Sequence, residues 1–146
     1  MNDRFKFRFY DNNKKIMIDE NTNNKILENE YGEDEWYWCI EAFMPTIFDY
    51  FDPVDYDKKD FVIMQCTGLK DKNGKLIYEG DIVKYKDEVY DLCIGKIEWD
   101  NAHYELQYYT GEKYGWFSHI LCFKHIKNIE VIGNIYENKE LLESEG

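Results

Sequence analysis

The chain has 146 residues, the length of one ordinary domain, and 44% of them are hydrophobic and 18% aromatic. Its formal net charge of −12 argues against binding DNA or RNA through phosphates, which requires clustered lysine and arginine. Aromatic side chains favour half-buried pleated surfaces, so the composition predicts a mainly β protein. We expect one domain over residues 1–146.

The N-terminal segment predicts a β-hairpin over residues 4–19. Residues 4–10 alternate with period two, which is typical of a strand with one buried face. Residues 11–13 favour a turn, and Ile16 and Ile18 a short returning strand. The first strand has three phenylalanines on one face and the chain's one basic cluster on the other: Phe5, Phe7, Phe9 and Arg4, Lys6, Arg8.

Residues 28–60 form an acidic segment that is rich in aromatic residues. It contains eleven acidic residues against Lys58 and Lys59, and so holds nine of the twelve net negative charges. Between residues 33 and 50 the pattern fits a short helix and a loop equally well. Aromatic anchors among carboxylates can attract and hold a basic partner, so this is the candidate partner-binding surface. Its members are Trp36, Tyr37, Trp38, Glu41, Phe43, Phe48, Asp49 and Tyr50. The alternative is that these aromatics cover an open end or edge of the β structure.

From residue 61 onward the pattern predicts short strands joined by tight turns. Strands are expected over residues 61–67, 76–78, 81–86 and 104–108, and Asn73-Gly74 is typical of a tight hairpin turn that needs positive φ. At Gly95 the apolar phase shifts between faces, which predicts a β-bulge or a sharp bend. Residues 129–135 recover period two, and residues 139–145 are expected to form a helical turn or two.

Residues 64–83, MQCTGLKDKNGKLIYEGDIV, resemble the YopX family of small phage and prophage proteins of Gram-positive bacteria. Three further segments resemble that family: KFRFYD near the start, GKIEWD at 95–100 and EVIGNIYENKELL at 130–142. The resemblance implies an SH3-like β-barrel or roll, with the N-terminal hairpin and the acidic segment 28–60 as additions to it. It implies no catalytic residue. Turn chemistry explains the motif without a site, because Asp71 and Asp81 flank turns where carboxylates accept backbone N–H bonds.

The residues that carry catalysis in other proteins do not form a convincing pattern here. His119, Cys122 and His125 have the spacing HxxCxxH, but on a strand Cys122 would face away from both histidines. Ser118 and His119 are neighbours and would point to opposite faces. A Cys66–His103 pair is left open by the sequence. We expect no enzyme activity, no metal and no cofactor.

The leading functional hypothesis is a phage or prophage accessory protein that binds another protein. A basic protein surface is the natural partner for this charge, and self-association is a second option. A binder of a nucleotide signal, using Arg4, Lys6 and Arg8, is the alternative, and a nucleic-acid-binding barrel is the less favoured one. Four dispersed cysteines and a charged N-terminus predict reduced thiols and a location in the bacterial cytoplasm, without membrane attachment.

Overall fold

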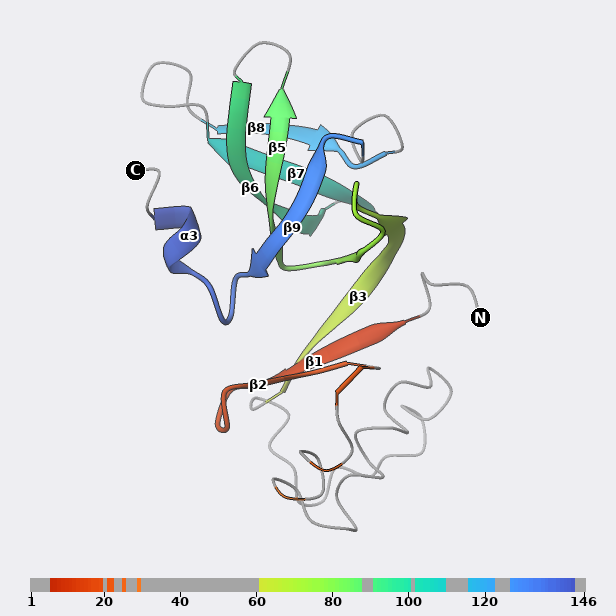
Figure 1. Cartoon of the computed structure of the whole chain (residues 1–146), viewed down its shortest axis with the longest axis vertical. Helices are drawn as coiled ribbons and strands as arrows, with labels where there is room; N and C mark the ends of the chain where they lie inside the picture. The colour runs from red at the N-terminus through yellow and green to blue at the C-terminus, as the bar shows by residue number, and fades with distance from the viewer. Residues whose placement is uncertain are drawn as a thin grey trace. The chain divides into compact units, whose positions relative to one another are not determined.

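The computed structural model (Figure 1) divides into two compact units, residues 5–64 and residues 65–146 with residues 1–4. The structure describes residues 6–19, 21, 22, 25, 29, 61–87, 91–100, 102–109, 116–122 and 127–143. The acidic segment 28–60, apart from Asn29, lies outside this description.

The described part of the chain is mainly β, as the composition predicts. One sheet has four strands in the order β2-β1-β3-β4, and the other has five in the order β8-β7-β6-β5-β9. Helix α3 (Glu140–Glu143) follows the last strand and agrees with the helical turn expected in the C-terminal tail. The strands are β1 Phe7–Asp11, β2 Ile16–Ile18, β3 Phe61–Lys70, β4 Leu76–Tyr78, β5 Asp81–Asp87, β6 Asp91–Asp100, β7 His103–Tyr109, β8 Trp116–Ile120 and β9 Ile129–Asn134.

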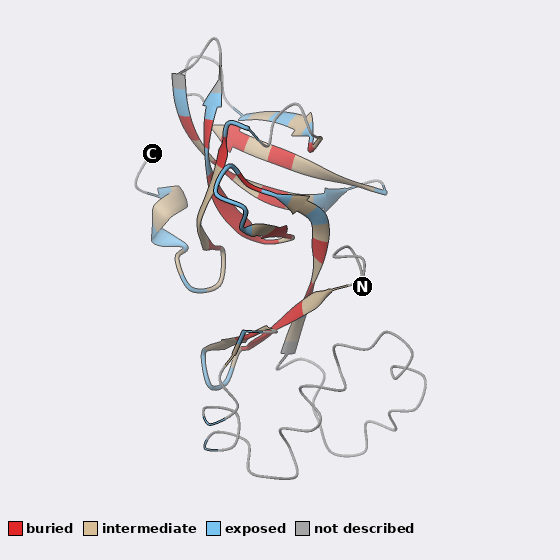
Figure 2. Cartoon of the chain, turned by 45° about the vertical axis from the view of Figure 1, so that its right-hand side comes forward, coloured by how far each residue is buried: buried red, intermediate tan, exposed pale blue. Residues whose placement is uncertain are grey.

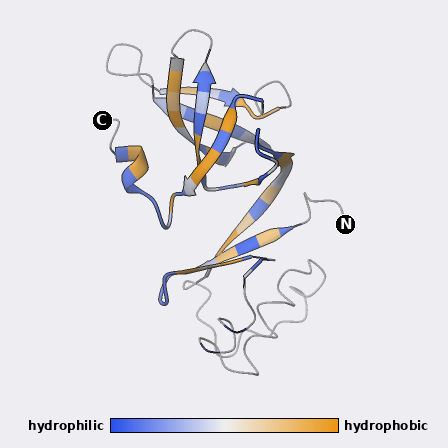
Figure 3. Cartoon of the chain, viewed as in Figure 1, coloured by the Kyte–Doolittle hydropathy of each residue, from blue (hydrophilic) through white to orange (hydrophobic). Residues whose placement is uncertain are grey.

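The predicted N-terminal hairpin is confirmed. Strands β1 and β2 pair antiparallel with Tyr10 opposite Met17, and hydrophobic and hydrophilic bands alternate along β1 (Figure 3). Asp11 organises the turn, since its Oδ1 accepts the backbone N–H of Asn13 at 2.9 Å and of Lys14 at 3.0 Å. A short acceptor side chain at the start of a turn therefore sets the hairpin.

The basic face predicted for β1 is not a solvent-exposed one. Arg8 is only 6% exposed, as buried as Phe9 on the other face of the strand. Lys6 is half-buried, and Arg4 lies outside the described residues. The prediction of one buried and one exposed face fails because both faces of β1 are covered: Arg8 and Tyr10 are buried on one face and Phe9 and Asp11 on the other. Burial removes Arg8 from the exposed phosphate-binding cluster on which the nucleotide hypothesis relied.

The tight turn predicted at Asn73-Gly74 is confirmed, and it joins β3 to β4 through a three-residue connection. The N–H of Asp71 donates to the carbonyl of Lys75 at 2.8 Å, and the N–H of Gly74 donates to the carbonyl of Asp71 at 3.0 Å. Only Gly74 among the central residues has positive φ, at 82°. This is a type I turn followed by a left-handed residue, the common three-residue hairpin connection.

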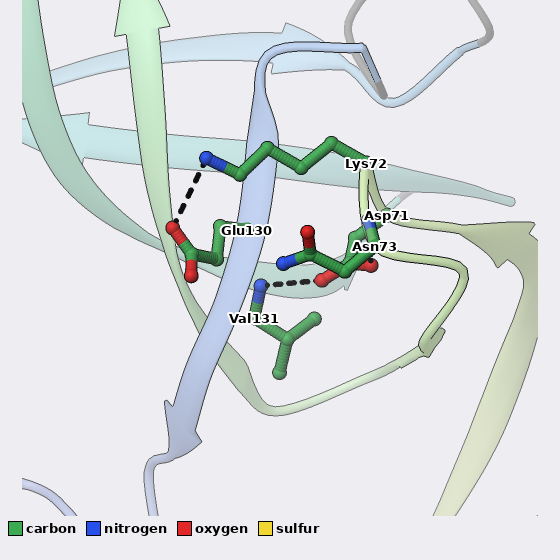
Figure 4. A network of polar contacts seen from close by, with 5 residues as sticks. All are labelled: Asp71, Lys72, Asn73, Glu130 and Val131. Carbon is green, nitrogen blue, oxygen red and sulfur yellow. Dashed lines mark hydrogen bonds and ion pairs between the residues drawn. The ribbon is translucent and has the colours of Figure 1, made fainter.

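Asp71 ties this loop to strand β9 (Figure 4). Its Oδ1 accepts the N–H of Asn73 and of Lys75, both at 2.9 Å, while its Oδ2 accepts the N–H of Val131 at 2.9 Å. The N–H of Lys72 also donates to the carbonyl of Ile129 at 3.0 Å. The loop thus covers the outer edge of β9.

The five-stranded sheet curls, as Figure 1 shows, and its inner face holds the hydrophobic core. Buried residues alternate with half-buried and exposed ones along β6 and β7 (Figure 2), and the alternation predicted for residues 104–108 is confirmed. The buried cluster comprises Ile77, Val83, Tyr85, Cys93, Ile97, Leu106, Tyr108, Leu121 and Ile129.

Gly95 does not form the predicted bulge. The pairing of β6 is regular through this position, with Val83 opposite Gly95 on one side and Tyr108 opposite it on the other. A Cβ at Gly95 would lie 2.3 Å from the carbonyl oxygen of Gln107, so the glycine permits close approach of two strands. The register shift occurs instead between β5 and β9, at Ile82 and Val83. The apolar phase shifts along β6 because the strand has apolar side chains on both faces, with Leu92 and Ile94 on one and Ile97 and Trp99 on the other.

Candidate binding surface

The partner-binding residues proposed from the sequence, between Trp36 and Tyr50, lie outside the described residues. Their role as a contact surface stays a prediction. The same holds for the choice between helix and loop in that segment. The described residues offer a second surface of similar chemistry, at the tip of the β6–β7 hairpin.

Trp99 is the central residue of this hairpin tip, which we define as residues 98–104. It lies next to the turn that joins β6 to β7 and is 51% exposed. Its ring packs edge-on against Tyr104, directly opposite on β7, with 4.7 Å between ring centroids and 67° between the planes. An aromatic side chain held by a second ring loses little conformational freedom on binding, and this favours Trp99 as an anchor.

The turn itself has unusual backbone geometry. Asp100 pairs with His103, which leaves residues 101 and 102 as the connection. Ala102 has φ of 67°, in the left-handed region that favours glycine or asparagine. A residue held in this conformation marks a tightly defined hairpin end, and such outliers are found more often at functional sites.

Tyr104 anchors the tip to the sheet. Burial raises the pKa of its phenol to about 12, and the nearby Glu79 carboxylate and Cys66 thiol contribute in the same direction. Its hydroxyl is buried and has no hydrogen-bond partner among the described residues. The phenol is therefore neutral over the physiological range and supports Trp99 as a packing surface.

Two carboxylates are next to Trp99 in the sequence, and strand alternation directs their side chains to the face opposite the indole. Glu98 and Asp100 are its sequence neighbours on β6, and Asp100 is exposed. Glu98 forms an ion pair with Lys96 two residues earlier on the same strand. The tip thus combines an aromatic anchor with acidic neighbours, the chemistry that the sequence suggested for residues 33–50. The signal that could have found it is a tryptophan between two acids, immediately before Asn101, a residue type that favours turns.

A polar row occupies the outer face of β7, opposite the core. His103 Nε2 lies 2.9 Å from Glu105 Oε1, and Gln107 Nε2 donates to Glu105 Oε2 at 3.2 Å. The hydrogen bond with His103, followed by those from Gln107 and Ser118, lowers the pKa of the Glu105 carboxyl. These contacts hold Glu105 ionised and position the row.

The candidate catalytic pairs are separated by the strand alternation, as the sequence predicted for Ser118 and His119. Ser118 is exposed beside the polar row, whereas His119 faces inward and its Nε2 lies 2.7 Å from the hydroxyl of Tyr108. The Cys66–His103 pair, which the sequence left open, is likewise separated. Cys66 is fully buried and its Sγ accepts the N–H of Gly68 at 3.4 Å, on the side of β7 that Tyr104 faces and His103 does not.

The HxxCxxH spacing does not assemble as a cluster in what the structure describes. His119 contacts Tyr108, Cys122 is half-buried and not in a disulfide, and His125 lies outside the described residues. Among described residues no group of three or more His, Cys, Asp or Glu side chains is placed to hold a metal ion. The helical residues that the structure describes include no segment long and apolar enough to span a membrane.

The two turn aspartates have the architectural roles predicted for them. Asp71 serves the β3–β4 loop as described above. Asp81 is 1% exposed, and its Oδ2 accepts the N–H of Tyr78 at 2.8 Å, which closes the turn at Gly80, whose φ is 84°. Backbone shaping explains both carboxylates.

Comparison with known proteins gives a family and similar solved structures. The chain is similar to protein EF1440 from Enterococcus faecalis, whose crystal structure matches with 24% sequence identity and a TM-score of 0.49, over 94% of this chain and 96% of that chain. No curated protein matches it. The family model described as YopX protein matches residues 6–143, nearly the whole chain, and so includes both sheets and the hairpin tip. The chain therefore belongs to the YopX family.

Proposed function

We propose that this chain is a non-enzymatic accessory protein of a phage or prophage. It acts in the bacterial cytoplasm by binding a basic surface of another protein. The observation that carries the proposal is Trp99, half exposed and held in place by Tyr104. Tryptophans of this kind are the commonest energetic anchors of protein interfaces. In fold terms the proposal treats the curled five-stranded sheet as an SH3-like barrel.

The charge supports a basic partner. The chain has a net charge of −12, and Glu98 and Asp100 are the sequence neighbours of Trp99 at the hairpin tip. Opposite charges speed the encounter of two proteins and fix their orientation, while a buried aromatic anchor supplies the affinity. The acidic segment around Trp36, Trp38 and Asp49 extends the same chemistry and is proposed as a second part of the surface.

The test is a comparison of variants in a pull-down from host cells that carry the phage or prophage. The full tagged chain should retain a basic protein, and Trp99→Ala should reduce its recovery about 30-fold, which is the effect of losing an anchor worth about 2 kcal/mol. The matched control is Leu92→Ala, which removes an equally exposed side chain, 57% exposed, from the other face of the same strand. The control should retain the partner.

Two further measurements make the result decisive. Binding should weaken as salt is added, since opposite charges are screened. Replacing Trp36, Trp38 and Asp49 together tests the second part of the surface. If neither this triple variant nor Trp99→Ala changes recovery of the retained protein, the proposed surface is wrong. Trp99→Phe, which keeps a ring against Tyr104, should preserve part of the binding.

A further inference from the structure

Strand β8 is an edge strand, and among the described residues it lacks the protection that edges usually have. It is the last strand of the five-stranded sheet, and its described pairing is with β7 alone. Natural proteins protect such edges with lysine, other charges, proline or a covering segment. The sequence of β8, WFSHI, contains neither lysine, arginine, acid nor proline, in a chain in which 33% of residues are charged.

The opposite edge of the same sheet is covered. On β9 the N–H of Val131 donates to Asp71, and the carbonyl of Ile129 accepts the N–H of Lys72. The loop of the β3–β4 hairpin thus occupies that edge. Among the described residues, β8 has no comparable cover, so the two ends of the sheet differ.

The exposed side chains of β8 are self-complementary. Trp116 is 60% exposed and Ile120 is 61% exposed, while the small residue Ser118 lies midway between them on the same face. Phe117 and His119 point the other way, against Tyr108. If two β8 strands pair antiparallel about Ser118, each tryptophan lies opposite the isoleucine of the other copy.

The backbone fits this pairing as well. The N–H of Leu121 donates to the carbonyl of Tyr104 on β7, at 2.8 Å. Because backbone groups alternate sides along a strand, the N–H and C=O groups of residues 116, 118 and 120 point to the open edge. The residues with exposed side chains are therefore also the ones that can bond to a new strand.

We propose that β8 pairs with β8 of a second copy of this chain, antiparallel and centred on Ser118, so that the two five-stranded sheets join in a symmetric dimer. Two copies that each have a charge of −12 repel one another over most of their surface, and an uncharged edge is where they can approach at least electrostatic cost. Since a five-residue strand buries less than the roughly 800 Å² per partner of a standard interface, the dimer should be reversible.

The proposal is tested on the full chain by light scattering across a range of protein concentration and salt. We expect a monomer that converts to a dimer as concentration rises. Salt should strengthen the dimer, because it screens like charges, whereas it should weaken binding of a basic partner. This opposite salt dependence separates the dimer from the function proposed above, whose described anchor, Trp99, lies on the other face of the sheet from Ser118.

Ser118→Pro is the decisive variant. Proline removes the N–H that points to the open edge and keeps the β7 side of the strand, a position where edge strands accept proline. We expect at least a tenfold weaker dimer. Ser118→Ala is the matched control, because it removes the same hydroxyl, which bonds to Glu105, and keeps the N–H. It should dimerise like the parent chain.

Crosslinking gives a readout that does not depend on whether the proline variant folds. In the proposed pairing the two Ser118 residues are directly opposite, with their Cα atoms about 5.5 Å apart, within the range of a disulfide. Ser118→Cys should therefore form a covalent dimer on mild oxidation, and Lys84→Cys, at an exposed position of β5, should not. A parent chain that stays monomeric at every concentration, or a dimer that Ser118→Pro leaves intact, would overturn the proposal.

Discussion

The carboxylate of Asp71 accepts a hydrogen bond of 2.9 Å from the backbone N–H of Val131, 60 residues further along the chain. The other oxygen of the same carboxylate accepts the N–H groups of Asn73 and Lys75 within its own loop. One buried side chain therefore shapes a hairpin and attaches it to the edge of the five-stranded sheet. Among side chains as short as this one, only a carboxylate has two acceptor oxygens, so that one can bond to the loop and the other to β9.

Replacing Asp71 should destabilise the fold. Asp71→Ala loses three hydrogen bonds and leaves the N–H of Val131 without its acceptor, which should lower the free energy of unfolding by about 3 kcal/mol. Asp71→Asn keeps an acceptor for the loop and should cost less, about 1–2 kcal/mol. Urea unfolding followed by tryptophan fluorescence measures both changes.

The control for this prediction is Lys72→Ala. The ion pair between Lys72 and Glu130 joins the same loop to the same strand at 3.2 Å, but its side chains are 47% and 37% exposed. Exposed pairs contribute about 0–1 kcal/mol. If Lys72→Ala is as harmful as Asp71→Ala, the carboxylate does not have the role described.

Two glycines should respond differently to substitution. Gly95→Ala places a methyl group 2.3 Å from the carbonyl oxygen of Gln107 and 2.9 Å from Cβ of Tyr108, so two strands must separate. We expect a loss of about 3 kcal/mol. Gly74 has open space around it, with φ of 82°, and Gly74→Ala should cost only about 1 kcal/mol of backbone strain.

Asparagine distinguishes the two causes. It tolerates the left-handed region better than alanine, so Gly74→Asn should be milder than Gly74→Ala. At position 95 the larger side chain should be worse than alanine. Thermal unfolding of the four variants tests this ordering, and the same ordering at both positions would contradict the steric account of Gly95.

Tyr104 should make stability sensitive to alkaline pH. Its pKa is raised to about 12 in the folded chain, against 10.0 for the ordinary phenol, because burial and Glu79 disfavour the phenolate. The contribution is fully present below pH 10 and is lost as pH rises from 10 towards 12, where only the unfolded chain ionises this group. Unfolding free energies measured at several pH values in this range test the prediction.

Tyr104→Phe is the matched variant for that experiment. Above pH 10 this variant should lose less stability than the parent chain. The twelve other tyrosines titrate in both proteins and so do not affect the comparison. Near neutral pH it should be as stable as the parent, because the hydroxyl has no hydrogen-bond partner among the described residues. Parallel pH profiles for the two proteins would mean that Tyr104 titrates normally.

Glu105 should make stability sensitive to acid. Hydrogen bonds from His103 and then Gln107 lower the pKa of its carboxyl below the ordinary 4.5. The stabilisation is present above pH 4.5 and is lost as pH falls through the lowered pKa of the folded chain. Glu105→Gln should therefore be less stable than the parent at neutral pH, with the gap closing in acid. Glu143→Gln, an exposed change on α3, controls for removing one negative charge. A gap that stays constant with pH would contradict the role of Glu105.

Local patterns in the sequence predicted much of the sheet structure. Tyr104, Leu106 and Tyr108 alternate cleanly because one face of β7 is core, and the turn at Gly80 follows from a residue that must adopt positive φ. Strand β8 had no such signal. Its exposed face carries Trp116 and Ile120, so the contrast between polar and apolar faces on which the prediction depends is absent.

The sequence by itself determined the class of the protein, its family resemblance, its turns and the alternation of its strands, because these depend on neighbours within a few residues. Only the tertiary structure decided that Arg8 is buried, that Gly95 is required by the approach of β7, and that Asp71 reaches Val131. It also decided that Trp99 is half exposed although it alternates in phase with buried Ile97. These outcomes depend on which strands become neighbours and on where a strand extends beyond the residues that cover it. Both are decided by pairing between segments that are far apart in the sequence.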